Sequence, residues 1–142
     1  MVANSPILPV PTFDRPVKLL IVAAIYDRAA ADVLIAAARK VHPDADLLEV
    51  PGALEVSAAI AMAERMAEFD GYIALGEVPA HGGMMVAEAW RSLSLLGLQG
   101  ACIGNGIGTG TQDGAAAAQA ALHLVAISRK WAAQTKGIGF RA

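Results

Sequence analysis

The chain has 142 residues, 56% of them hydrophobic, and a formal net charge of -2 without clustered lysine or arginine. This length supports one domain with one core, and the charge excludes the basic surface that nucleic acid binding needs. No apolar run approaches the roughly 20 residues of a membrane span, and we do not expect a secretory signal because no basic segment followed by an apolar one precedes the first predicted strand. The apolar share exceeds the usual value of roughly 45–50%, which predicts subunit interfaces as well as a core. A single cysteine, Cys102, excludes an internal disulfide and fits the cytoplasm.

The first segment of the chain is rich in proline. Residues 1–17 contain four prolines with aliphatic residues between them, a composition that favours an extended arm over a packed element. The sequence therefore predicts an N-terminal arm over residues 1–17 and a single α/β domain over residues 18–142.

After the arm, short apolar runs alternate with segments whose apolar residues recur every three or four positions. The runs predict buried strands and the periodic segments predict helices. Strands are expected at 18–24, 47–50, 71–76 and 101–104, and helices at 27–41, 53–69, 82–96 and 115–131. This order predicts an α/β fold of three layers, a four-stranded parallel sheet between helices with flavodoxin-like winding.

The unusual segments of the sequence follow the predicted strands. In open parallel sheets, ligands bind outside the carboxyl ends of the strands. A tyrosine and an aspartate follow the first predicted strand, and a Pro-Gly-Ala-Leu-Glu segment follows the second. A segment with a histidine follows the third strand, and a glycine-rich segment follows the fourth. We therefore expect a ligand site at this edge of the sheet.

Three motifs carry a resemblance to a known family. VPGALEV (50–56), YIALGEV (72–78) with a histidine shortly after it, and IGNGI (103–107) before an alanine-rich helix ending in SRKW resemble lumazine synthase. The similarity covers about residues 17–131. It implies condensation of 5-amino-6-ribitylamino-uracil with 3,4-dihydroxy-2-butanone 4-phosphate in riboflavin biosynthesis, without metal or organic cofactor. It also implies sites built between subunits of a pentamer or of an assembly of pentamers.

The resemblance assigns substrate-binding roles to residues of these motifs. Tyr26 would stack on the heterocycle, and its alternative is a packing residue at a strand end. The carboxylate of Glu55 would accept from sugar hydroxyls, and a first-turn acid favoured by the helix dipole is its alternative. Asn105 would come from the adjacent subunit. The remaining substrate-binding residues would be Gly52, Ala53, Leu54, Gly76, Glu77 and Val78.

His81 would be the catalytic acid–base residue of the family. A histidine suits this role because its unperturbed pKa, about 6.5, allows both protonation states near neutral pH. The alternative is a solvated surface histidine at a helix start. His42 and His123 gain no role from the resemblance.

The sequence departs from the family in the two segments that hold the substrate phosphate. The family carries an Arg-Gly-Glu-Thr run before the histidine, where this chain has only Pro79-Ala80. The family also carries an arginine and an Asn-Lys-Gly segment before the last helix, where this chain has GTGTQDG. The glycine-rich loop could cradle an anion with its N–H groups, which makes Gly106, Gly108 and Thr109 candidate phosphate-binding residues. Its alternative is a connection shortened to a tight turn.

Two functions follow from the sequence. The first is a lumazine synthase with a rebuilt phosphate site. The second is a catalytically impaired lumazine synthase-like protein that binds a lumazine- or flavin-type ligand or serves as an oligomeric assembly. A flavodoxin-like nucleotide-binding domain ranks last, because it leaves the Pro-Gly-Ala-x-Glu element unexplained.

Overall fold

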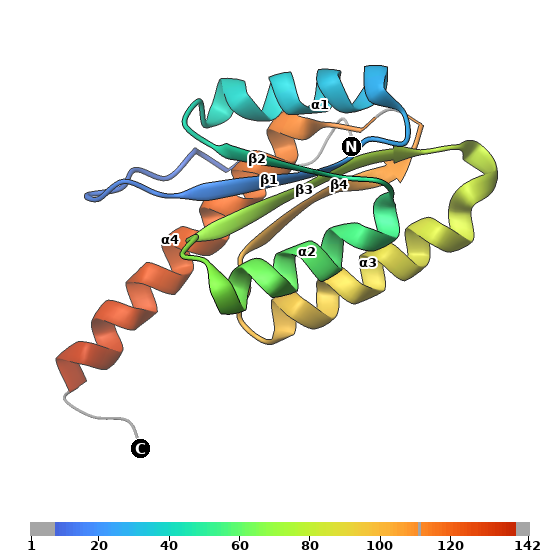
Figure 1. Cartoon of the computed structure of the whole chain (residues 1–142). Coiled ribbons are helices and arrows are strands. Elements are labelled where there is room, and N and C mark those ends of the chain that lie inside the picture. The colour runs from blue at the N-terminus through green and yellow to red at the C-terminus, as the bar shows by residue number, and fades with distance from the viewer. Residues whose placement is uncertain (1–7, 111, 139–142) are drawn as a thin grey trace.

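The computed structural model describes residues 8–110 and 112–138. In chain order the elements alternate between strand and helix (Figure 1). They are β1 (Leu19–Ala24), α1 (Arg28–Val41), β2 (Asp46–Val50), α2 (Ala53–Met66), β3 (Gly71–Val78), a 3-10 turn (Ala80–Gly82), α3 (Gly83–Leu98), β4 (Ile103–Thr109) and α4 (Gly114–Ile138). The predicted α/β fold is confirmed. Among the described helices, none has the length and apolar character needed to cross a membrane.

The four strands form one parallel sheet in the order β2-β1-β3-β4. Helices α1 and α4 cover one face, and α2 and α3 cover the other (Figure 1). The two central strands are apolar because both of their faces are covered. The six residues of β1, LLIVAA, are all buried. The sheet therefore separates two cores and presents the carboxyl ends of all four strands at one edge.

The fourth strand is longer than the sequence analysis predicted. Residues 105–109, expected in a glycine-rich loop, continue β4 and pair with β3 up to Thr109 beside Val78. Glycine permits this because α4 passes very close to the strand. A Cβ on Gly104 would collide with the carbonyl oxygen of Ala117, and a Cβ on Gly106 would lie 2.7 Å from a side-chain carbon of Leu75. These glycines are packing residues of a strand rather than hinges of a loop.

Helix α4 is also longer than predicted, and it holds the end of the N-terminal arm. Its first turn is capped by Asp113, whose carboxylate accepts from the N–H of Ala116 at 3.1 Å. In Figure 1 its last turns extend beyond the sheet. Arg129 of α4 donates to the carbonyl oxygens of Arg15 and Pro16 at 2.9 and 2.8 Å.

The rest of the arm agrees with an extended segment as far as the structure describes it. Residues 8–17 contain no helix or strand, and residues 1–7 lie outside the described residues. The division into an arm and one domain stays a prediction.

Candidate active site

A cavity of about 640 Å³ opens at the carboxyl ends of β1 and β3, between the starts of α2 and α3. It lies at the edge of the sheet where the sequence predicted a ligand site. Its volume is that of a small-molecule pocket. The lining residues are Ala24, Tyr26, Gly52, Ala53, Leu54, Glu55, Glu77, Val78, Pro79, His81, Gly82, Met84, Met85 and Glu88.

The Pro-Gly-Ala-Leu-Glu segment forms one wall, where β2 ends and α2 begins. Gly52 is the residue before α2 and has extended backbone angles, and Glu55 lies in the first turn of that helix. A Cβ on Gly52 would lie 3.1 Å from a carboxylate oxygen of Glu55. The glycine therefore leaves room for this carboxylate beside the backbone, at the positive end of the helix dipole.

His81 lies in the 3-10 turn that links β3 to α3, at the mouth of the cavity. The turn is closed by the N–H of Gly82, which donates to the carbonyl oxygen of Pro79 at 2.8 Å. A Cβ on Gly82 would collide with the side chain of Val78. The glycine thus lets the chain turn tightly after β3, and this turn brings the exposed imidazole of His81 to the cavity.

Tyr26 follows β1 and lines the same cavity from the end of a different strand. Its side chain is 72% exposed. A tyrosine that packs at a strand end would be largely covered. The exposure therefore favours a ring that is available for stacking over a purely structural residue.

The charged groups of the lining are mostly acidic. Glu55, Glu77 and Glu88 reach the cavity from α2, β3 and α3, and His81 is its basic residue. Neither lysine nor arginine belongs to the lining within the described chain. The cavity presents carboxylate acceptors and apolar surface, which suit a donor-rich heterocycle better than an anion.

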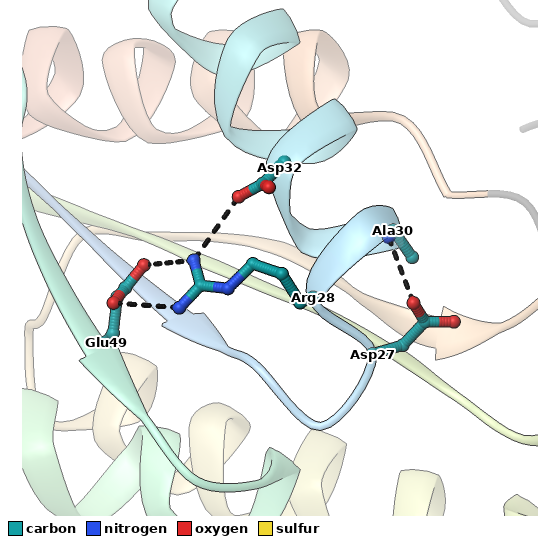
Figure 2. A network of polar contacts seen from close by, with 5 residues as sticks. All are labelled: Asp27, Arg28, Ala30, Asp32 and Glu49. Atoms are coloured by element: carbon teal, nitrogen blue, oxygen red, sulfur yellow. Dashed lines mark hydrogen bonds and ion pairs between the residues drawn. The ribbon is translucent and has the colours of Figure 1, made fainter.

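Arg28, at the same edge of the sheet, is engaged by acidic groups outside the cavity lining. Its guanidinium binds both carboxylate oxygens of Glu49 and one oxygen of Asp32 (Figure 2). This pairing raises the pKa of Arg28 and lowers the pKa of the Glu49 carboxyl. Nearby, Asp27 caps α1 by accepting from the N–H of Ala30 at 3.1 Å. The arginine links α1 to β2 and does not supply a cation to the cavity.

Comparison of the sequence with known proteins shows which family this chain belongs to. A model of the family described as 6,7-dimethyl-8-ribityllumazine synthase matches residues 16–135. The chain belongs to the lumazine synthase family. It is 44% identical to the 6,7-dimethyl-8-ribityllumazine synthase of Jannaschia sp. (strain CCS1), over 94% of this chain and 88% of that protein. It is 34% identical to the enzyme of that name from Novosphingobium aromaticivorans, over 80% and 98%, and 34% identical to 6,7-dimethyl-8-ribityllumazine synthase 1 of Rhizobium meliloti, over 84% and 97%.

The comparison with the Jannaschia relative bears on the two shortened segments of this lumazine synthase family member. The aligned stretch spans 156 positions, more than the 142 residues of this chain. The relative therefore contains residues that this chain lacks.

Eight predicted substrate-binding or catalytic residues line the cavity together, and two others lie elsewhere. Gly76 is buried in β3, where a Cβ would lie 2.9 Å from the Cβ of Ala24. Asn105 is exposed on β4 and lines a separate hollow beside Trp90 and Leu98. Its own side chain accepts from the N–H of Ile107 at 3.0 Å. The position of Asn105 is compatible with a residue offered to another subunit, and that role stays a prediction. The eight are Tyr26, Gly52, Ala53, Leu54, Glu55, Glu77, Val78 and His81.

The candidate phosphate-binding residues lie in β4, next to the cavity but outside its lining. Ile107 donates its N–H to Asn105 and accepts the indole N–H of Trp90 at 2.6 Å, so its backbone faces away from β3. Because successive residues of a strand alternate in direction, the backbone groups of Gly106 and Gly108 face β3 instead. The last residue of β4, Thr109, is exposed. The phosphate role of these three residues stays a prediction, and this geometry favours Thr109 among them.

Sequence reasoning missed the part of the lining that α3 supplies. Met84, Met85 and Glu88 follow His81 by three, four and seven positions. That spacing places the three residues on one face of a helix. The sequence does not show that this face borders the cavity, because the packing of α3 decides it.

Proposed function

We propose that this chain is a working lumazine synthase that condenses 5-amino-6-ribitylamino-uracil with 3,4-dihydroxy-2-butanone 4-phosphate. The observation that carries the proposal is that Tyr26, Glu55 and His81, from three separate segments, line one cavity in a chain of this family. The relatives are named for the same product. The single cysteine, Cys102, is buried, which fits work in the cytoplasm.

The proposed reaction requires proton transfers at several stages. The amino group of the pyrimidine attacks the ketone, and water leaves as an imine forms. Phosphate then leaves by elimination, and the ribitylamino nitrogen closes the ring with loss of a second water. Each stage moves a proton onto or off an oxygen, nitrogen or carbon atom. In our proposal the imidazole of His81 moves these protons, Tyr26 stacks on the pyrimidine, and Glu55 accepts from ribityl hydroxyls.

In our proposal the substrate phosphate lies beside the cavity lining, at the end of β4. Gly108 and Thr109 pair with Glu77 and Val78, which both line the cavity. Thr109 offers a hydroxyl there, and the backbone after it leads into the connection before α4. A phosphate dianion also needs cationic partners. Since the described lining supplies only His81, we place any further cation on a neighbouring subunit.

A second function is favoured by the same acidic lining. Three carboxylates without lysine or arginine would disfavour a phosphate ester, so a protein that binds a lumazine- or flavin-type ligand without condensation is the alternative. The two functions differ in turnover rather than in binding of the heterocycle.

Removing the carboxylate of Glu55 should weaken binding of the ribityl ligand. We expect Glu55→Ala to raise the dissociation constant of the lumazine product roughly tenfold, because a hydrogen bond to a charged group contributes about 1.5 kcal/mol or more. Isothermal titration calorimetry measures this, with Glu68→Ala, an exposed glutamate outside the lining, as the control. An unchanged affinity would contradict the placement of the ribityl chain.

We also propose a homo-oligomer, a pentamer or an assembly of pentamers, with the hollow around Asn105 at a subunit contact. The exposed apolar side chains Trp90, Leu98 and Leu124 line this hollow and are 47%, 86% and 39% exposed. Such a cluster is typical of a protein interface.

A charge in this hollow should dissociate the oligomer. We expect Leu98→Glu to shift the sedimentation coefficient towards that of a monomer, because the interface would have to bury an unpaired carboxylate. Val33→Glu, at a site 70% exposed on α1, is the matched control and should leave the oligomer intact. A wild-type protein that sediments only as a monomer would refute the shared-site picture.

A further inference from the structure

Helix α3 forms one wall of the cavity. Its first turns have two distinct faces. Val86, Ala89 and Leu93 are buried against the sheet. On the other face, Met84, Met85 and Glu88 line the cavity, one turn or two after His81. An acid is thus held on a helix, an element that positions side chains more precisely than a loop does, beside two flexible apolar side chains.

The side chain of Glu88 is exposed, and no hydrogen bond or ion pair joins its carboxylate to another described residue. Several other acids of the chain do have such partners. Glu49 and Asp32 bind Arg28, and Asp70 binds Arg129. An acid at a cavity wall without a structural partner is available to accept hydrogen bonds from a ligand.

The position of Glu88 relative to the other lining carboxylates defines what it would contact. Glu55 lies on the α2 wall and Glu77 on β3, so Glu88 adds an acceptor on the third side. A bound pyrimidine that carries an amino group, an alkylamino group and a polyol presents hydrogen-bond donors along its whole length. Acceptors on three walls match such a ligand, whereas a phosphate ester offers almost only acceptors and negative charge.

We propose that Glu88 is a further specificity-determining residue of this site, which accepts hydrogen bonds from the donors of the amine substrate and discriminates against anionic groups on the α3 side. This inference rests on the proposed function for the identity of the ligand. It predicts that the carboxylate acts on affinity for the two substrates in opposite directions.

The test is a comparison of Glu88→Ala and Glu88→Gln with wild type and with Glu68→Ala. For Glu88→Ala we expect a roughly tenfold higher dissociation constant for the lumazine product and a similar rise in KM for ribitylaminouracil, with kcat changed less than twofold. Glu88→Gln keeps an acceptor oxygen but loses the charge. Its KM for ribitylaminouracil should lie between the values of wild type and Glu88→Ala. Its KM for the butanone phosphate should be lower than that of wild type. Glu68→Ala should match wild type throughout.

The outcomes separate this inference from the proposed function. A wild type without turnover, whose product affinity nevertheless falls in Glu88→Ala, would refute the synthase and support Glu88. An active wild type with unchanged product affinity and KM values in both Glu88 variants would refute Glu88 and leave the synthase intact. A wild type that binds neither substrate nor product would overturn both. Because Glu88 is exposed, its replacement is expected to leave the urea midpoint unchanged.

Discussion

Replacing His81 with alanine is expected to lower turnover by roughly 100- to 10,000-fold, the usual contribution of a general acid–base residue. The imidazole lies at the mouth of the cavity on a short turn and is exposed. Its removal should therefore leave the fold and the affinity for the lumazine product nearly unchanged, within about twofold. Steady-state fluorescence kinetics with product titrations would separate the two effects.

The matched control for this variant is His123→Ala, a half-buried histidine of α4 outside the cavity lining. It should keep wild-type turnover. Two results would count against the acid–base assignment: equal turnover in His81→Ala and wild type, or a loss of activity that follows entirely from weaker substrate binding.

The second large effect is expected at Gly104, where β4 meets α4. In Gly104→Ala the new methyl group would collide with the backbone carbonyl oxygen of Ala117, which cannot rotate away as a side chain can. We expect a loss of about 3 kcal/mol or more in the free energy of unfolding, at the upper end of the range for overpacked sites, because strand and helix must separate. Urea denaturation at one fixed protein concentration measures it.

Gly83→Ala provides the opposite result in the same protein. Gly83 is the first residue of α3 and has open space where a Cβ would be placed. Alanine there should stabilise the protein by about 0.5–1 kcal/mol, since it reduces the freedom of the unfolded chain. If Gly104→Ala unfolded at the same urea concentration as wild type, this result would contradict the close approach of α4 to β4.

The architecture could be predicted because its signals are local. Central strands covered on both faces must be apolar along their whole length, as in residues 19–24, and helices with one covered face show a period near 3.6. The alternation of such segments then fixes a parallel sheet and the edge at which ligands bind.

The extent of β4 could not be predicted, because its cause lies in a distant segment. Alternating glycines suggest a loop when they are considered alone. In the fold, Gly104 is required by the close passage of Ala117 on α4 and Gly106 by the side chain of Leu75 on β3, and no local pattern reveals these contacts. The phosphate-binding role of Gly106, Gly108 and Thr109 in this segment stays a prediction.

The candidate site also contains residues that could be predicted from the sequence and residues that could not. Residues next to strand ends, such as Tyr26 and Glu77, were found because topology brings strand ends together and the family resemblance assigns roles to them. Glu88 was missed because it belongs to the interior of a helix, and only the placement of that helix beside the cavity shows its role. The partners of Arg28 also come from packing, since Glu49 is far from it in sequence.

The most direct test of the central claim is to follow lumazine fluorescence with purified protein, ribitylaminouracil and the butanone phosphate, against the same mixture without protein. We predict a saturable rate above that of the control, which would establish a synthase despite the shortened phosphate-binding segments. A rate equal to that of the control, in protein that still binds the lumazine product, would contradict the synthase and leave a ligand-binding member of the family.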